Sequence, residues 1–255
     1  SGTIATFTRT PEEDFRLVAG YEVGNRGTHY ANVGVSRLWS RWAASMRLRG
    51  HTTDGYFIIP EARRGSVDTP AAARFVAGDS RIDFLGSAQK FFLKLDILAE
   101  TRDNGTRLTE NTTSLGTLAG HYLREGSQNS FSALAYHTRE VYRASFSSVT
   151  ATRNSESITF LQTVPSTAVG AAATWKRSAD LWSVIAGGDA QRVEGTSTDR
   201  LASGALRVGG GSQRQGGAFV QLAGGRRDNA QIFAGARQQF TSGGSEFFSQ
   251  SGGFL

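Results

Sequence analysis

Residues 31–51 read ANVGVSRLWSRWAASMRLRGH, and this stretch decides the fold that we predict for the chain. On both sides of Ser40-Arg41 the apolar residues recur at every second position, and polar or charged residues stand between them. A period of two is typical of an amphipathic strand, because successive side chains of a β-strand point to opposite faces. We therefore predict two strands joined by a tight turn at Ser40-Arg41, each with one apolar and one polar face.

The same alternation continues along the rest of the chain and gives eleven strands in all. It is regular in segments 15–23, 93–99, 115–119, 131–135, 167–175 and 232–236, and less regular in segments 74–86, 181–194 and 214–224. The long apolar helical stretches of a soluble α/β enzyme are absent from the sequence, and no run of about 18 apolar residues suggests a transmembrane helix. These patterns predict an all-β protein.

The connections between the predicted strands alternate in length after the first hairpin, at 24–27. The tight ones are 40–41, 87–90, 126–128, 177–180 and 225–229, and the long polar ones are 51–73, 101–113, 139–156, 195–213 and the tail from 241. Outer-membrane barrels have short periplasmic turns and long extracellular loops, whereas a soluble sandwich or propeller has no reason to sort its loops by parity. We therefore predict an antiparallel up-and-down transmembrane β-barrel in the cell outer membrane.

All four tryptophans flank predicted tight turns. Trp39 and Trp42 enclose the turn at 40–41, and Trp175 and Trp182 enclose the turn at 177–180. Aromatic residues gather at the membrane interfaces of such barrels, so we predict that the four form a periplasmic girdle. The alternative is that they cap the core of a soluble β-protein at its strand ends.

Composition limits the other functional classes. The 255 residues contain no cysteine, which excludes disulfide scaffolds, thiolate metal sites and cysteine nucleophiles. The net charge of +6 comes from many arginines and only three lysines, Lys90, Lys94 and Lys176. Because the arginines are scattered and not clustered among stacking aromatics, we expect no nucleic-acid partner. Arginine suits bidentate pairing with carboxylates inside a polar barrel, or with the phosphates of lipopolysaccharide.

The opening Gly2-Thr3-Ile4-Ala5-Thr6-Phe7-Thr8-Arg9 resembles the end of the plug domain of TonB-dependent receptors. The stretch 42–70 is similar to the same family, with Thr53-Asp54-Gly55-Tyr56 and then Val67-Asp68-Thr69-Pro70. So is the run from Leu161-Gln162-Thr163-Val164-Pro165-Ser166 to Trp175, followed by Ala186-Gly187-Gly188-Asp189. The resemblance implies a barrel of twenty-two strands, plugged by an N-terminal domain, that imports siderophores, cobalamin, nickel complexes or sugars with energy from TonB.

The chain departs from that family because it lacks the plug and the TonB-contacting box and has about half of the strands. Eleven is also an odd number, whereas bacterial single-chain barrels use even ones, and 251–255 makes a poor closing strand. We therefore expect residues 1–10 to end a plug and 11–255 to form a partial barrel, the N-terminal half. Hydrocarbon does not tolerate unpaired strand edges, so an isolated half is expected as a curved open sheet or a small forced barrel.

The expected function is a receptor and transporter for uptake of a siderophore-like, vitamin or other nutrient ligand. Its partners would be outer-membrane lipid and lipopolysaccharide, the TonB complex through the missing plug, and a small molecule such as a metal chelate. A passive porin or another outer-membrane barrel is the alternative, and a soluble all-β binding or adhesion protein is a second one. The expected lining of the lumen is Arg47, Arg49, Lys94, Asp96 and Glu100, with charges that pair across neighbouring strands.

The sequence predicts no catalytic residue, no metal site and no cofactor, and hence no enzyme. The four histidines have no ligand spacing, and no Gly-x-Ser-x-Gly elbow is present. The glycines at 209–211 do not match a phosphate-binding loop and are interpreted as flexible loop. A rim enzyme would have to use the acids around the second long loop, which we interpret instead as solvated: Glu61, Asp68, Asp79 and Asp83.

Overall fold

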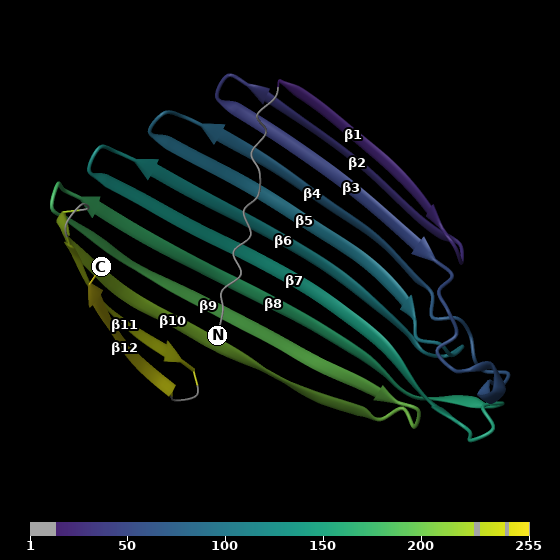
Figure 1. Cartoon of the computed structure of the whole chain (residues 1–255). Helices are drawn as coiled ribbons and strands as arrows, with labels where there is room; N and C mark the ends of the chain where they lie inside the picture. Colours follow the sequence, from purple (N-terminus) through teal and green to yellow (C-terminus); the bar gives the residue numbers. More distant parts are fainter. Residues whose placement is uncertain (1–13, 227–229, 243–244, 255) are drawn as a thin grey trace.

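The computed structural model describes residues 14–226, 230–242 and 245–254, and in these residues one antiparallel sheet contains every strand (Figure 1). Each strand pairs with its neighbours in sequence, from β1 to β12. The strands are β1 Phe15–Gly24, β2 Thr28–Trp39, β3 Trp42–Thr53, β4 Ala73–Leu85, β5 Gln89–Asp103, β6 Glu110–Glu125, β7 Asn129–Val149, β8 Glu156–Ser178, β9 Trp182–Leu201, β10 Leu206–Arg226, β11 Ala230–Thr241 and β12 Ser245–Phe254.

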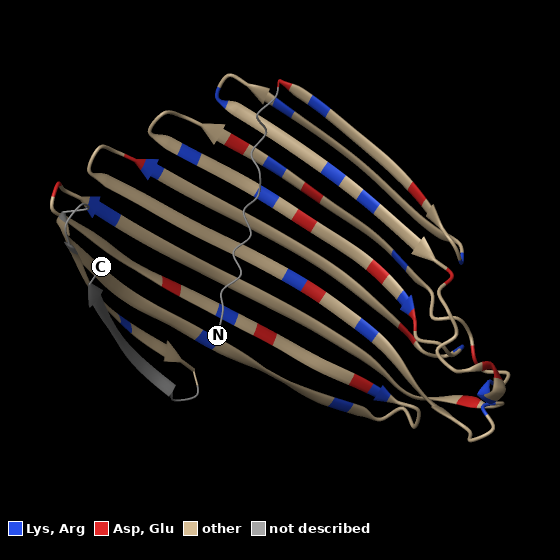
Figure 2. Cartoon of the chain, in the orientation of Figure 1, with Lys and Arg blue, Asp and Glu red and all other residues tan. Residues whose placement is uncertain are grey.

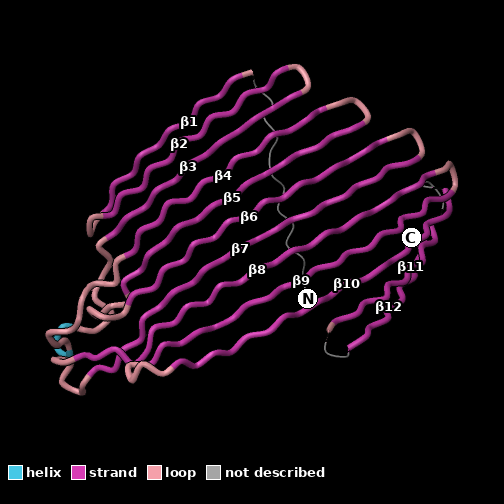
Figure 3. Tube along the Cα trace, turned by 180° about the vertical axis from the view of Figure 1, so that it is seen from behind, coloured by secondary structure: helices cyan, strands magenta, loops and turns pink. Residues whose placement is uncertain are grey.

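The predicted fold class is confirmed, because the sheet is all antiparallel, runs up and down, and is open. Figures 1 and 3 show it curved like part of a barrel wall, with β1 and β12 as its two edges. Within the described residues these two edge strands do not pair with each other. Residues 1–10, expected to end a plug domain, lie outside the described residues.

The strand count of about eleven rises to twelve in the described residues, because β12 lies within the expected polar tail. It pairs with β11 from Thr241↔Ser245 to Ile232↔Phe254. A strand at the edge of a sheet is held by backbone hydrogen bonds to one neighbour, so it can form without a regular apolar pattern. The described strand number is therefore even and not odd, and the two edges of the sheet are open as expected.

Two of the expected long loops are mostly strand. Strands β7 to β10 have 21, 23, 20 and 21 residues, and the connections between β7 and β8 and between β9 and β10 shrink to 150–155 and 202–205. The expected glycine loop at 209–211 is part of β10, where Gly211 pairs with Gly195. These segments are polar and show no apolar alternation, so the sequence did not indicate strands. They are strands because their backbones form hydrogen bonds with neighbouring strands. A membrane crossing needs about ten strand residues, so these strands extend well beyond an apolar band.

Tight turns and longer connections still gather at opposite ends of the sheet (Figure 3). The turns 40–41, 86–88, 126–128 and 179–181 define what we call the turn end. The opposite loop end carries the tight first turn, 25–27, and the connections 54–72, 104–109, 150–155 and 202–205, of which 54–72 is long and contains the 3-10 helix η1, Glu61–Arg63. The described residues include no helix that is long and apolar enough to cross a membrane.

The two faces of the sheet differ in polarity and in exposure. In β5 the apolar Leu93, Leu95 and Ile97 are 43 to 49% exposed, and the alternate Lys94 and Asp96 are half-buried. Among described strand residues other than glycine, all of the buried ones lie on the face of Lys94: Ala43, Ala77, Arg81, Asp83, Ala144 and Asp199. Side chains crowd on the inside of a curved sheet, so this polar face is the concave one and the apolar face is the convex one.

Candidate functional site

The tryptophans lie at the turn end of the apolar face. Their exposed fractions are 43% for Trp39, 50% for Trp42, 39% for Trp175 and 44% for Trp182. Trp39 and Trp42 are cross-strand partners, and the Trp42 ring meets Phe84 edge-on with centroids 5.1 Å apart. The four indoles therefore share one face and one end of the sheet, and their role as an interfacial girdle stays a prediction.

All five residues expected to line a lumen lie on the polar face, Arg47 and Arg49 on β3 and the others on β5. The backbone register aligns Arg47 with Asp79 and Asp79 with Asp96 across three strands. Figure 2 shows that such charges are spread along the strands, and β6 and β8 carry none between their ends.

The expected charge pairing across neighbouring strands is wrong for Lys94 and Glu100, which pair along their own strand. Lys94 Nζ lies 2.8 Å from Asp96 Oδ1, and Arg102 Nη2 lies 2.8 Å from Glu100 Oε1. Side chains two residues apart on one strand share a face and stand about 7 Å apart, a distance that a lysine or arginine spans easily.

A buried ion pair of the polar face lies on β4, and the sequence analysis assigned its acid, Asp83, to a loop and did not single out its base, Arg81. Arg81 is 8% exposed and Asp83 is 2% exposed, and Arg81 Nε lies 2.9 Å from both carboxylate oxygens of Asp83. The Arg81 guanidinium lies over the Phe92 ring, 4.1 Å from its centroid. Phe92 in turn contacts His121, with ring centroids 5.3 Å apart. The sequence does contain a signal for this pair. Asp79, Arg81 and Asp83 stand at every second position, which indicates one face of a strand and not a loop.

A polar cluster joins β8, β9 and β10 nearer to the loop end. Asp199 is 5% exposed and accepts hydrogen bonds from Gln162 Nε2 at 3.0 Å, Ser197 Oγ at 3.2 Å and Arg207 Nε at 2.9 Å. Closer to the turn end, Arg237 Nη2 on β11 lies 2.7 Å from Asp189 Oδ1 on β9. On the polar face, Asp199 and Asp189 of β9 therefore each form an ion pair with an arginine of another strand.

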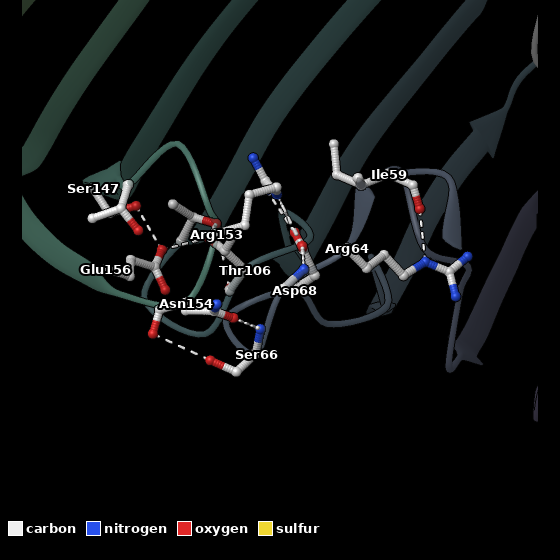
Figure 4. A network of polar contacts seen from close by, with 12 residues as sticks. Ile59, Arg64, Ser66, Asp68, Thr106, Ser147, Arg153, Asn154 and Glu156 are labelled. Carbon is white, nitrogen blue, oxygen red and sulfur yellow. Dashed lines mark hydrogen bonds and ion pairs between the residues drawn. The ribbon is translucent and has the colours of Figure 1, made fainter. Parts of the chain in front are cut away.

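The loop end is held together by the ion pair between Asp68 and Arg153 (Figure 4). Arg153 Nε donates to Asp68 Oδ1 at 3.0 Å and Oδ2 at 2.9 Å, and the Asp68 side chain is 1% exposed. The hydrogen bond from Arg153 lowers the pKa of Asp68 from 3.8 to about 2, and the same contact raises the pKa of Arg153. The carboxylate is therefore charged at every physiological pH.

Further hydrogen bonds join three connections at this end. In connection 54–72, Ser66 N donates to Asn154 Oδ1 at 3.0 Å and Thr69 N donates to Gly105 O at 3.0 Å. Glu156, at the start of β8, accepts from Thr106 Oγ1 at 2.5 Å. Connections 54–72, 104–109 and 150–155 thus form one folded unit, which we call the loop clasp.

The acids considered for a rim enzyme do not come together. Glu61 lies exposed on η1, Asp68 is used by Arg153, and Asp79 and Asp83 lie in β4 and not in a loop. The described part of the chain contains no group of three or more His, Cys, Asp or Glu side chains arranged to hold a metal ion.

The sequence matches no protein-family model and no curated protein sequence. Solved structures do match. The copper transporter OprC superposes with a TM-score of 0.69 at 12% identity, over 97% of this chain and 42% of its own. The ferric yersiniabactin uptake receptor FyuA from Yersinia pestis superposes with a TM-score of 0.69 at 13% identity, over 97% of this chain and 44% of its own. The ferric-catecholate import receptor Fiu from E. coli K12, in its open form, superposes with a TM-score of 0.68 at 9% identity, over 97% of this chain and 52% of its own.

These neighbours are TonB-dependent receptors, so the resemblance predicted from the sequence is confirmed at the level of the fold. The chain spans about half the length of the receptors that it matches. At identities of 9 to 13% the likeness establishes a shared architecture, that of a partial receptor barrel.

Proposed function

We propose that the chain is one part, the N-terminal half, of the barrel of an outer-membrane TonB-dependent receptor that takes up a small-molecule nutrient. The observation that carries the proposal is the match of nearly the whole open sheet to part of such receptors. The neighbours are described as a copper transporter and as receptors for ferric chelates, which favours a metal chelate as ligand.

In this proposal the concave polar face faces the lumen, where Arg47, Arg49, Lys94, Asp96 and Glu100 meet either the plug or the ligand. The charged rows on β3, β4 and β5 support this role, because arginines and carboxylates exposed on the convex face would meet hydrocarbon. The plug, preceding residue 11, would contact the TonB complex.

The proposed orientation places the turn end in the periplasm and the loop end outside the cell. The four exposed tryptophans of the apolar face support it, as do β7 to β10, which have 20 to 23 residues each. Strands of that length project above the bilayer, and in this proposal their outer halves and the loop clasp would receive the ligand.

The test is energised uptake by cells that express the whole protein containing this chain. Ferric catecholate chelate, copper(II) and cyanocobalamin, each radiolabelled, are supplied to paired strains with and without a functional TonB. A receptor accumulates at least one probe only when TonB is present, and the protein fractionates with the outer membrane.

The two alternatives give different results in the same assay. A passive porin admits the probes equally in both strains and conducts ions in a planar bilayer. A soluble all-β binding protein is recovered without detergent and is absent from outer-membrane fractions. Either result overturns the proposal.

A further inference from the structure

The apolar face also carries charged residues, and on four strands they are arranged in the same order. Beyond the turn end itself, where Arg226 ends β10, the first charged residue on this face of β4, β7, β9 and β10 is an arginine. These residues are Arg74, Arg139, Arg192 and Arg214. On β9, for example, Trp182, Val184, Ala186, Gly188 and Ala190 precede Arg192.

Three of these arginines lie within four consecutive strands, β7 to β10. His137, Val169, Arg192 and Arg214 stand opposite one another in a single row across β7, β8, β9 and β10. Strands lie about 4.8 Å apart, so this row is about 14 Å long. Arg139 follows His137 on the same face of β7, one step nearer the loop end, opposite Thr167. We call Arg139, Arg192 and Arg214 the outer arginine patch.

The patch carries an unbalanced positive charge. Arg192 Nη2 lies 2.6 Å from Glu194 Oε2, and both side chains are about half exposed. Arg139 and Arg214 are exposed, and neither side chain forms an ion pair with any other side chain that the structure describes, which are those of residues 14–225 and 231–242. Two exposed guanidinium groups therefore remain available to an external anion.

The height of the patch agrees with the level of a bilayer headgroup. Arg192 is ten residues from Trp182 on β9, and Arg214 is ten residues from Gly224 on β10. Ten strand residues span about 33 Å along the strand and about 25 Å along the membrane normal at a tilt near 40°. That is the height of the apolar band of an outer-membrane barrel, so the patch lies at the outer boundary of the band.

We propose that the outer arginine patch binds the phosphate groups of lipopolysaccharide in the outer leaflet. A guanidinium holds a phosphate by two parallel hydrogen bonds, and the two uncompensated arginines stand three strands apart, so each can hold a different phosphate of one multiply phosphorylated lipid. The arginines at the turn end are placed differently, because Arg37 lies over the Trp39 ring and Arg177 over the Trp182 ring. This inference rests on the proposed outer-membrane location and orientation.

The test compares lipopolysaccharide retained by protein purified from outer membranes in mild detergent. The whole protein carrying both Arg139→Gln and Arg214→Gln is expected to retain about tenfold less lipopolysaccharide than the unchanged protein, because charged hydrogen bonds are lost. The 3-hydroxy fatty acids of lipid A measure lipopolysaccharide, and phosphatidylglycerol is measured in the same samples. Arg37→Gln with Arg177→Gln is the matched control, since it removes the same charge at the turn end.

The pair Arg139→Lys with Arg214→Lys restores the charge and is expected to restore most of the retention, which separates a local role from misfolding. Unchanged retention in the glutamine pair, an equal loss in the control, or a parallel loss of phosphatidylglycerol overturns the inference. If the glutamine pair keeps its lipopolysaccharide while TonB-dependent uptake is intact, only this inference fails. If the protein is absent from the outer membrane, the proposed function fails as well.

Discussion

Asp68 and Arg153 are 85 residues apart in the sequence, yet both carboxylate oxygens of Asp68 lie within 3.0 Å of Arg153 Nε. The contact joins the long connection between β3 and β4 to the short one between β7 and β8. It fixes the largest loop of the described chain against the end of the sheet, so the loop end is an ordered surface.

Replacement of Asp68 by Asn is expected to loosen the loop clasp. The substitution removes the charge that Arg153 contacts, and the side chain is almost fully shielded, so a neutral amide leaves the guanidinium poorly compensated. Limited proteolysis within residues 54–72 should become several-fold faster. Glu61→Gln, an exposed acid in the same connection, is the control and should leave the rate unchanged. Equal rates for Asp68→Asn and the unchanged protein would contradict a role for the pair.

The loop clasp is expected to open in acid. The pKa of Asp68 falls from 3.8 to about 2 in the folded protein, so the native state binds this proton less tightly than the unfolded chain does. Its contribution is fully present above pH 3.8 and is lost as the pH falls towards 2. Hydrogen exchange of the Ser66 and Thr69 amides should therefore show constant protection above about pH 4 and a loss below it. In Asp68→Asn this pH step should be absent.

Asp83→Asn is expected to destabilise the sheet more than a charge change on its surface. Arg81 and Asp83 are 8% and 2% exposed, and removal of one partner of a buried ion pair costs about 3 kcal/mol. Glu194→Gln breaks the half-exposed pair with Arg192 and should cost less than about 1 kcal/mol. Urea unfolding of the protein in detergent micelles measures both. Equal unfolding midpoints for the two variants would show that the buried pair stabilises the protein no more than the half-exposed pair does.

Gly170→Ala is expected to destabilise the wall between β7 and β8. A Cβ atom there would lie 2.6 Å from Tyr136 Cε1, and the Tyr136 hydroxyl is held 2.8 Å from Gln191 Oε1. Displacing the ring should cost about 1 to 3 kcal/mol, the range for overpacked sites. Gly116→Ala, where no atom lies within 4 Å of the added Cβ, should be neutral in the same unfolding assay.

Much of the fold was predictable because alternation is a local property of a strand. The faces of Leu93 and Lys94 follow from the pleat alone, and the turn between Trp39 and Trp42 follows from two alternating runs that meet at Ser40-Arg41. The lengths of the later strands were not predictable in the same way. Gly195 and Gly211 have no side chain to show a pattern, and they are strand because each has the other as a backbone partner.

For the charged residues, the face of the strand was likewise predictable from the sequence, whereas the ion-pair partner was not. That Arg47 and Arg49 share one face of a strand, and that Lys94, Asp96 and Glu100 share one face of another, was evident from their spacing of two. Their partners were not, since Lys94 reaches along its own strand to Asp96 and not across the sheet.

The sequence by itself determined that this protein is an antiparallel sheet with an apolar and a polar face and with tryptophans at one end. Those features depend on neighbours within a few residues, and the backbone geometry of a strand translates them directly into structure. Only the tertiary structure decided between a curved open sheet and a small closed barrel, and only it showed the burial of Arg81 with Asp83 and the pairing of Asp68 with Arg153. Those depend on strands and loops far apart in the chain, which meet only when the register of every intervening pair is set.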